Sequence, residues 1–129
     1  MRVLLDTHVL LWAVGSPNEL SADAVAILND ITTEILVSSV TALEIATKHR
    51  LGKLSIATPL LAAYDAQLSR LRATDLPLTT SHGLYAGQLV WEHKDPFDRA
   101  LAAQSMIESV PLITKDAAFA TLPGIRTIW

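Results

Sequence analysis

The sequence predicts an α/β fold: a three-layer α/β/α sandwich around a central, mostly parallel sheet. Three short apolar runs, at residues 3–5, 35–37 and 110–114, have the length and branched side chains of strands buried on both faces. Segments with helical spacing separate these runs, and strands that alternate with helices are typical of a parallel sheet covered on both faces. With 129 residues, the chain is expected to form one domain, residues 1–129, with a core of its own.

The first strand leads into a short helix at residues 7–14. Asp6 or Thr7 is its N-cap, and the Gly15-Ser16-Pro17 segment ends it. Ser21 is the expected cap of a second helix. The apolar residues that recur in that helix at helical spacing are Ala24, Ile27, Leu28 and Ile31.

The second strand is followed by a helix from residue 40 to about residue 51. Ser38-Ser39 supplies its cap, and Gly52 is its stop signal. Residues 60–71 then predict a fourth helix, which Thr58-Pro59 opens.

In the carboxyl-terminal half, residues 74–78 predict an edge strand, because Pro77 is poorly tolerated in a central one. Residues 79–90 are expected to be helical. Asp95-Pro96 opens a further helix that runs to about residue 109, with proline at the first helical position. The remaining expected elements are a third central strand at 110–114, a helical turn at 116–122 and a last strand at 125–128.

Composition narrows the possible classes of protein. The chain has no cysteine, which excludes disulfides and thiolate metal sites and is typical of a reducing, cytoplasmic location. Its longest apolar run, residues 9–14, is too short to span a bilayer, so we expect no membrane association. The mean hydropathy of +0.35 is high for a small soluble domain, and some apolar surface is therefore expected to contact another chain.

Four acidic residues are placed so that the fold would bring them to one edge of the sheet. Asp6 follows the first strand, Glu44 lies on the helix after the second, Asp98 lies in the first turn of its helix, and Asp116 follows the third central strand. The carboxyl ends of parallel strands meet at one edge, where ligands bind in open sheets. We therefore predict that Asp6, Glu44, Asp98 and Asp116 form one metal site.

Each acid also has a structural explanation when it is considered alone. Asp6 and Asp116 are in N-cap positions. Glu44 is four residues before Lys48, a spacing that gives a surface pair worth only about 0.3–0.5 kcal/mol. Glu44 also shares a half-apolar stripe, where a carboxylate is costly unless a cation or hydrogen-bond donors meet it. The other members of that stripe are Val40, Thr47 and Leu51.

The segment from Asp95 to Arg99 contains two acids with different expected roles. Asp95 precedes the first helical proline and is a natural cap. Asp98 lies within the first turn, where the helix dipole favours an anion with or without a metal. Asp98 is therefore the better ligand candidate, and Asp95 is the better structural acid.

Several carboxylates crowded together repel one another unless a cation is present, and hard divalent ions such as Mg²⁺ and Mn²⁺ prefer oxygen ligands. A zinc-type site is disfavoured because the chain lacks cysteine and its histidines are scattered, so that each is expected at the surface or in packing. The histidines are His8, His49, His82 and His93. With the four acids neutralised, nine of the 13 acidic side chains remain against ten basic ones, so the net charge of −3 argues only weakly against nucleic acid.

Four stretches of the chain contain the acids and the residues around them: LLDTHVLLWA (4–13), VSSVTALEIATKHRLGKL (37–54), HKDPFDRALAAQS (93–105) and LITKDAAF (112–119). These stretches resemble the PIN-domain family and, within it, the VapC toxins of bacterial type II toxin–antitoxin systems. The acidic quartet of the family falls on Asp6, Glu44, Asp98 and Asp116, with no member missing. The resemblance implies a Mg²⁺- or Mn²⁺-dependent endoribonuclease that is inhibited by a VapB-type antitoxin and usually forms homodimers.

Under this resemblance, Asp6 and Asp98 would be direct ligands, Glu44 would ligate or orient water, and Asp116 would act from outside the ligand set. Three further residues are expected to contact the substrate, an RNA such as tRNA or rRNA. Ser39 would donate or accept a hydrogen bond in the site, and Lys48 and Arg99 would guide RNA phosphates.

Two alternative functions remain open from the sequence alone. A non-catalytic PIN-like interaction module would be expected to lose part of the quartet, which this chain keeps. A receiver-like, Mg²⁺-binding signalling domain has a similar length and fold, and Thr114-Lys115 resembles its Thr/Lys pair. Such a domain needs adjacent acids after its first strand, whereas Asp6 is followed by Thr7 and Glu44 lies inside a helix.

Overall fold

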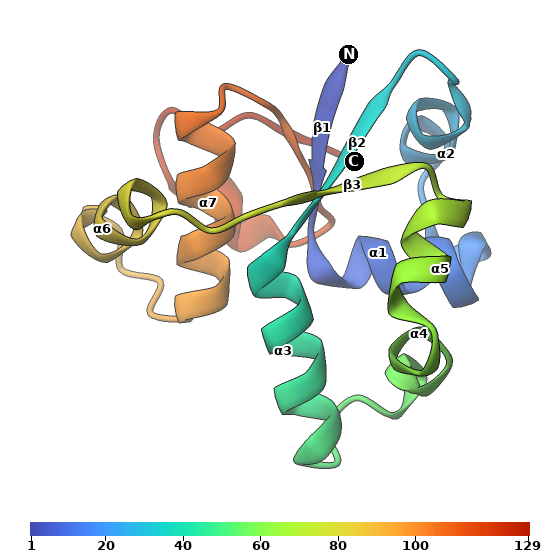
Figure 1. Ribbon diagram of the computed structural model, residues 1–129. Helices are drawn as coiled ribbons and strands as arrows, with labels where there is room; N and C mark the ends of the chain where they lie inside the picture. The colour runs from blue at the N-terminus through green and yellow to red at the C-terminus, as the bar shows by residue number, and fades with distance from the viewer.

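The computed structural model describes residues 1–129 as a five-stranded sheet with helices on both faces (Figure 1). The strands are β1 (Arg2–Leu5), β2 (Glu34–Ser38), β3 (Ala73–Leu76), β4 (Leu112–Ile113) and β5 (Thr127–Ile128). Their order in the sheet is β3-β2-β1-β4-β5, and every neighbouring pair is parallel. The predicted α/β/α sandwich is therefore confirmed, and the sheet is entirely rather than mostly parallel.

The helices begin and end close to the predicted signals. They are α1 (Thr7–Gly15), α2 (Ala22–Asn29), α3 (Ser39–Arg50), α4 (Thr58–Ala62), α5 (Tyr64–Arg70), α6 (Thr80–Gln88) and α7 (Pro96–Ile107). Three 3₁₀ segments complete the chain: η1 (Pro17–Glu19), η2 (Ser55–Ala57) and η3 (Ala117–Thr121). Asp6, Ser21, Ser38, Asp95 and Asp116 all accept hydrogen bonds from backbone N–H groups as N-caps, as their positions predicted.

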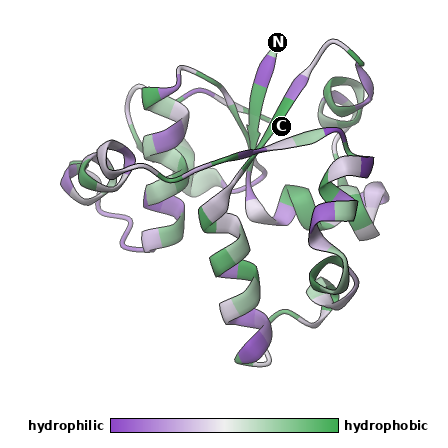
Figure 2. Ribbon diagram, in the orientation of Figure 1, coloured by the Kyte–Doolittle hydropathy of each residue, from purple (hydrophilic) through white to green (hydrophobic).

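Successive strand residues alternate between two apolar cores, one on each face of the sheet. Val3 and Leu5 pack with α1, α2, α4 and α5, whereas Leu4 packs with α7 and η3. Figure 1 shows α2, α4 and α5 on one side of the sheet and α6 and α7 on the other. In Figure 2, β1 and β2 are largely hydrophobic where these layers cover them. A buried parallel sheet produces this continuous apolar pattern.

Helix α3 stands at the carboxyl edge of the sheet and contributes to both cores. Val40 packs in the α7 core, and Ile45 packs in the α1 core. Glu44, next to Ile45, is consequently buried, with only 4% of its surface exposed. Gly52 ends this part of the chain with a φ of +73°, a left-handed conformation that favours glycine.

Three boundaries differ from the prediction. The single helix expected at 60–71 is two helices, α4 and α5, because Ala63 adopts a non-helical conformation (φ −150°, ψ 51°) between them. Ile31 lies beyond α2 and is 83% exposed, so it is not part of the apolar face of that helix. Strands β4 and β5 pair over only two residues each, although Val110 to Thr114 is buried throughout.

Candidate active site

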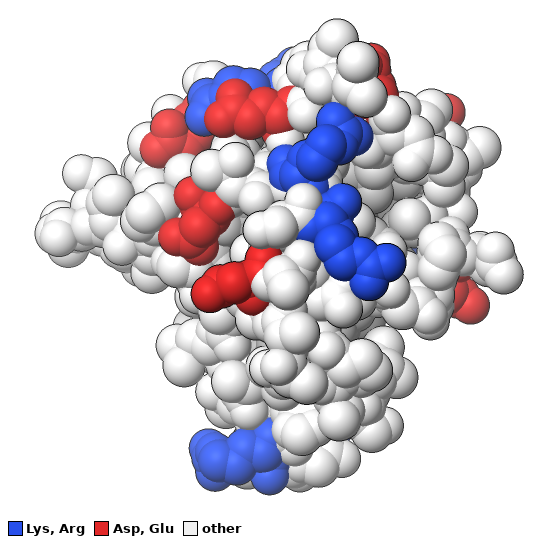
Figure 3. Space-filling model, turned by 45° about the vertical axis from the view of Figure 1, so that its right-hand side comes forward, with Lys and Arg blue, Asp and Glu red and all other residues white.

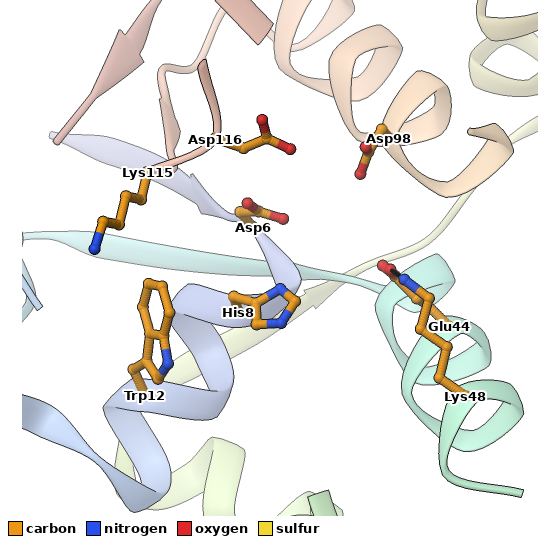
Figure 4. A pocket seen from close by; sticks show the side chains of 8 residues that line it. All are labelled: Asp6, His8, Trp12, Glu44, Lys48, Asp98, Lys115 and Asp116. Carbon is orange, nitrogen blue, oxygen red and sulfur yellow. Dashed lines mark hydrogen bonds and ion pairs between the residues drawn. The ribbon is translucent and has the colours of Figure 1, made fainter. Parts of the chain in front are cut away.

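The four predicted acids line one pocket of about 290 Å³ at the carboxyl edge of β1 and β4. Figure 4 shows their side chains coming from β1, α3, α7 and the segment after β4. The complete lining is Asp6, His8, Trp12, Glu44, Lys48, Asp98, Lys115 and Asp116. The topology therefore brings together acids that are up to 110 residues apart in the sequence.

Two hydrogen bonds fix the Asp6 carboxylate at the carboxyl ends of β1 and β4. Its Oδ1 accepts a hydrogen bond from the Thr7 N–H at 2.7 Å, and its Oδ2 accepts one from the Thr114 hydroxyl at 2.7 Å. Burial raises the pKa of Asp6, and the Glu44 carboxylate adds to this effect, although the two hydrogen bonds oppose it. The charge of His8 also opposes the rise, but Asp6 forms no salt bridge with a lysine or an arginine.

Glu44 has partners for both of its oxygens. Its Oε1 accepts a hydrogen bond from the Thr7 hydroxyl at 2.6 Å, and its Oε2 forms an ion pair with the Lys48 ammonium. Lys48 also lies 5.9 Å from the centroid of the Phe97 ring. The ammonium of Lys48 therefore neutralises Glu44, the most deeply buried acid of the quartet.

Asp98 faces the pocket from the first turn of α7. Asp95 caps that helix by accepting from the N–H groups of Phe97 and Asp98 at 2.8 and 3.1 Å, so the predicted division between the two acids is confirmed for Asp95. Asp98 Oδ2 is 2.6 Å from His93 Nε2. Burial, followed by the charges of Asp95, Asp6 and Glu44, raises the pKa of Asp98 to about 6, despite the His93 contact.

Asp116 is the exposed member of the quartet. Its Oδ1 caps η3 by accepting from the Ala118 N–H at 2.9 Å, and its own N–H donates to the Thr114 hydroxyl at 3.0 Å. Because the same hydroxyl donates to Asp6, Thr114 links the two acids at the ends of β1 and β4.

The donor set of the pocket fits a hard divalent cation. All four acids offer oxygen ligands, and mutual repulsion contributes to the raised pKa of Asp6 and Asp98. No three acidic or histidine side chains, however, are gathered closely enough to make a complete ligand cluster. Glu44 in particular would have to exchange Lys48 for the metal. The ligand roles of Asp6, Glu44, Asp98 and Asp116 stay predictions.

Of the three predicted substrate residues, only Lys48 lines the pocket. The Ser39 hydroxyl instead accepts a hydrogen bond from the Leu78 N–H at 2.9 Å and ties α3 to the segment after β3. Arg99 donates to five backbone carbonyls between residues 86 and 93, at 2.6 to 3.4 Å. These contacts give Ser39 and Arg99 structural roles, and their predicted contacts with RNA stay predictions.

Sequence reasoning missed four residues at the site. His8, Trp12 and Lys115 line the pocket, and His93 contacts Asp98. The expectation of surface or packing positions fits His82, which is buried and 2.9 Å from Glu108, and His8, which is exposed and packs against Trp12. The expectation did not include the contact of His93 with Asp98. The available signal was the i, i+4 spacing of His8 and Trp12 in the helix that Asp6 caps, which places both on the same face.

Comparison with known proteins identifies the family. The PIN domain family matches residues 3–125, so this chain belongs to that family. This membership, together with the sheet order, removes the receiver-like alternative. No curated protein sequence matches the chain. No helix of the structure combines the length and apolar character needed to cross a membrane.

Several solved structures share the whole fold at low sequence identity. A chain of VapBC from Salmonella typhimurium, solved with DNA, superposes with a TM-score of 0.73 and 20% identity, covering 99% of this chain and 97% of the other. A chain of VapBC2 from Rickettsia felis, bound to a promoter DNA fragment, superposes with a TM-score of 0.69 and 17% identity. The match covers 99% of this chain and 98% of the other. A chain of a toxin–antitoxin complex from Klebsiella pneumoniae has a TM-score of 0.65 and 15% identity, with 98% of this chain and 96% of the other covered.

Proposed function

We propose that this chain is a divalent-metal-dependent endoribonuclease of the VapC type. The main support is the Asp6–Asp98 side of the pocket, where two carboxylates with raised pKa have no positively charged lysine or arginine partner. Carboxylates in that state bind a hard cation favourably, because the cation removes their mutual repulsion. PIN domains are typically nucleases and generally use divalent metals, which agrees with this chemistry.

Asp6 and Asp98 would hold the cation, and Glu44 would join them or orient water after its lysine is displaced. A bound Mg²⁺ or Mn²⁺ would supply Lewis acidity at the scissile phosphate and lower the pKa of a nearby water. The Thr114 and Thr7 hydroxyls keep Asp6 and Glu44 in fixed orientations. Lys48, once released from Glu44, would contact the phosphate. Cleavage would leave a 5′-phosphate and a 3′-hydroxyl.

The surface charge fits a local rather than a broad contact with RNA. Figure 3 shows acidic and basic side chains side by side on the face it presents, with a separate basic cluster at its lower end. A protein without a large basic footprint gains little non-specific affinity from phosphates, so we expect recognition of a particular RNA shape, as in tRNA or rRNA.

Protein partners are the second part of the proposal: a VapB-type antitoxin and a second copy of the chain. An apolar groove of about 520 Å³ lies between α3, α6 and α7, with Val40, Leu78 and Phe97 in its lining. Several large apolar side chains of the molecule are exposed, including Leu43, Leu84 and Val90. The structural relatives named VapBC and the Klebsiella toxin–antitoxin complex support a partner of this class.

The decisive experiment is cleavage of total cellular RNA and of tRNA by the purified, antitoxin-free protein with Mg²⁺ or Mn²⁺. We expect discrete cuts that disappear in chelator and in Asp98→Asn. Asp23→Asn is the matched control, because Asp23 also lies in the first turn of a helix but is exposed and outside the pocket. Cutting that survives both chelator and Asp98→Asn would refute the proposal.

A non-catalytic interaction module is the second candidate. It is favoured by one observation: the Glu44 carboxylate is already neutralised by Lys48, so this acid of the pocket needs no metal to compensate its charge. Calorimetry separates the two functions. Binding of Mn²⁺ that is lost in Asp98→Asn supports the nuclease, and the absence of any Mn²⁺ binding to the wild-type protein supports the module.

A further inference from the structure

The pocket has two halves of different chemistry. Asp98 and Glu44, the latter with Lys48, lie on one side, and Trp12 and Lys115 lie on the other (Figure 4). His8 lies between them, below Asp6. Trp12 is the single hydrophobic residue of the lining. An indole in a pocket otherwise made of charged and polar side chains is unusual, because a partly exposed aromatic ring is better covered in an apolar core.

Trp12 is held in place by other aromatic rings. Its centroid lies 5.8 Å from that of Trp129, with an angle of 53° between the planes, and 5.7 Å from that of His8, with an angle of 50°. These separations are typical of tilted aromatic pairs. Helix α1, which begins at Asp6, fixes the distance between the indole and the acids. The ring is therefore a rigid, partly exposed platform next to the candidate metal ligands.

Lys115 supplies the positive charge of this half. Its ammonium lies 5.9 Å from the Trp12 ring centroid, and Lys115 forms no salt bridge. Lys48, the other lysine of the pocket, is paired with Glu44. An aromatic platform with an unpaired, exposed ammonium above it combines the two groups that bind single-stranded nucleic acid: a face on which a base stacks and a cation for its phosphate.

We propose that His8, Trp12 and Lys115 form a subsite for one unpaired nucleotide of RNA, adjacent to the scissile phosphate. The base stacks on Trp12, and the Lys115 ammonium contacts the phosphate of the same nucleotide. This inference rests on the proposed ribonuclease function and specifies its substrate: an RNA that is unpaired at the cut. A base in a duplex is stacked on its neighbours, so its face is not available to the indole.

The subsite is tested by binding rather than by cleavage. A short single-stranded RNA is titrated into the wild-type protein in chelator, and the indole N–H resonances of Trp12, Trp91 and Trp129 are followed by NMR. We expect the Trp12 resonance to shift most. The same RNA in a duplex should bind more weakly, and single-stranded DNA of the same sequence reports how much of the binding depends on the 2′-hydroxyl.

Variants assign the affinity to individual groups. Trp12→Ala should weaken binding of single-stranded RNA by about 5- to 100-fold, the usual loss for an aromatic stacking residue, whereas Trp12→Phe should retain most of the affinity. Lys115→Met should flatten the dependence of affinity on salt. Trp91→Phe and Lys53→Met are the matched controls, since neither residue lines the pocket. Circular dichroism establishes that each variant is folded.

The outcomes separate this inference from the proposed function. If single-stranded RNA does not bind, if it binds without moving the Trp12 resonance, or if Trp12→Ala binds as tightly as wild type, the subsite is refuted. If the subsite is refuted but the wild-type protein cuts RNA in a metal-dependent way, the nuclease proposal stands without the subsite. Trp12-dependent binding by a protein that cuts no RNA supports the subsite and refutes the nuclease.

Discussion

His93 Nε2 lies 2.6 Å from Oδ2 of Asp98, so a histidine from the irregular segment before α7 contacts the acid that faces the pocket. The histidine is itself held on two sides. Its ring packs against Trp91 at a centroid distance of 4.8 Å, and its carbonyl accepts a hydrogen bond from Arg99 at 3.0 Å. A rigid donor of this kind orients a carboxylate before any ligand arrives.

We therefore expect His93 to be a positioning residue for Asp98. His93→Ala should weaken Mn²⁺ binding, measured by calorimetry, and RNA cleavage by about 10- to 100-fold, the usual effect of removing a partner of a metal ligand. His93→Gln, which keeps a side-chain N–H donor, should restore part of both. Equal losses in the two variants would show that the ring, rather than its hydrogen bond, is what matters.

Asp98 should lower the stability of the metal-free protein at neutral pH. Its pKa is raised from 3.8 in the unfolded chain to about 6 in the folded protein. The protonated carboxyl therefore costs no stability below pH 3.8, and the free energy of unfolding falls as the pH rises from 3.8 through 6. At pH 7 in chelator, Asp98→Asn should therefore increase the free energy of unfolding by about 1–3 kcal/mol, at about 1.4 kcal/mol per pKa unit.

This prediction is checked by urea unfolding at pH 7 and pH 3.5. The gain of Asp98→Asn should nearly vanish at the lower pH, where the wild-type carboxyl is protonated in the folded state and mostly protonated in the unfolded state. Adding Mn²⁺ at pH 7 should reverse the order of the two proteins, because the cation stabilises only the protein with a ligand at position 98. A variant that is less stable than wild type in chelator at pH 7 would contradict the prediction.

Lys48 should stabilise the metal-free protein by neutralising Glu44. Lys48→Met leaves a buried carboxylate with only the Thr7 hydroxyl as partner, and we expect a loss of about 1–3 kcal/mol in the free energy of unfolding. Glu44→Gln combined with Lys48→Met should recover most of this loss, because no charge is then left unpaired. Denaturant titration of both single variants and the double variant measures the coupling, and a coupling near zero would contradict the ion pair.

Arg99 should be required for the fold rather than for RNA binding. Arg99→Lys replaces a planar fork with a single ammonium, which cannot reach the same five carbonyls. We expect a loss of about 2–4 kcal/mol in thermal or urea unfolding, because several partly buried carbonyls are left without donors. A variant with normal stability and reduced RNA affinity would instead support the contact with RNA predicted from the sequence.

The fold was largely predictable because its signals are local. Strand residues buried on both faces form continuous apolar runs, and Asp6, Ser21, Ser38 and Asp95 sit where helix caps are expected. The break between α4 and α5 had no such signal, since it occurs at Ala63, without glycine or proline. That position is decided by how the two helices pack, which a local pattern does not contain.

The acids of the site were predictable and most of their neighbours were not. Asp6 and Asp98 are identified by their position at strand and helix ends, which the parallel topology converts into proximity. Ser39 and Arg99 have the right chemistry and a nearby position in the sequence, but their side chains turn toward backbone groups of Leu78 and of residues 86–93. Which way a polar side chain turns depends on the unpaired backbone groups that the tertiary fold presents to it.

The Arg99 guanidinium couples the position of Asp98 to the connection between α6 and α7. Asp98 and Arg99 are adjacent in α7. Asp98 faces the acidic pocket, whereas Arg99 donates hydrogen bonds to carbonyls at the end of α6 and in the connection from α6 to α7. The connection, including His93, is thereby fastened to the same helical turn that carries the acid. The position of Asp98 therefore depends on the conformation of this connection as well as on its own helix.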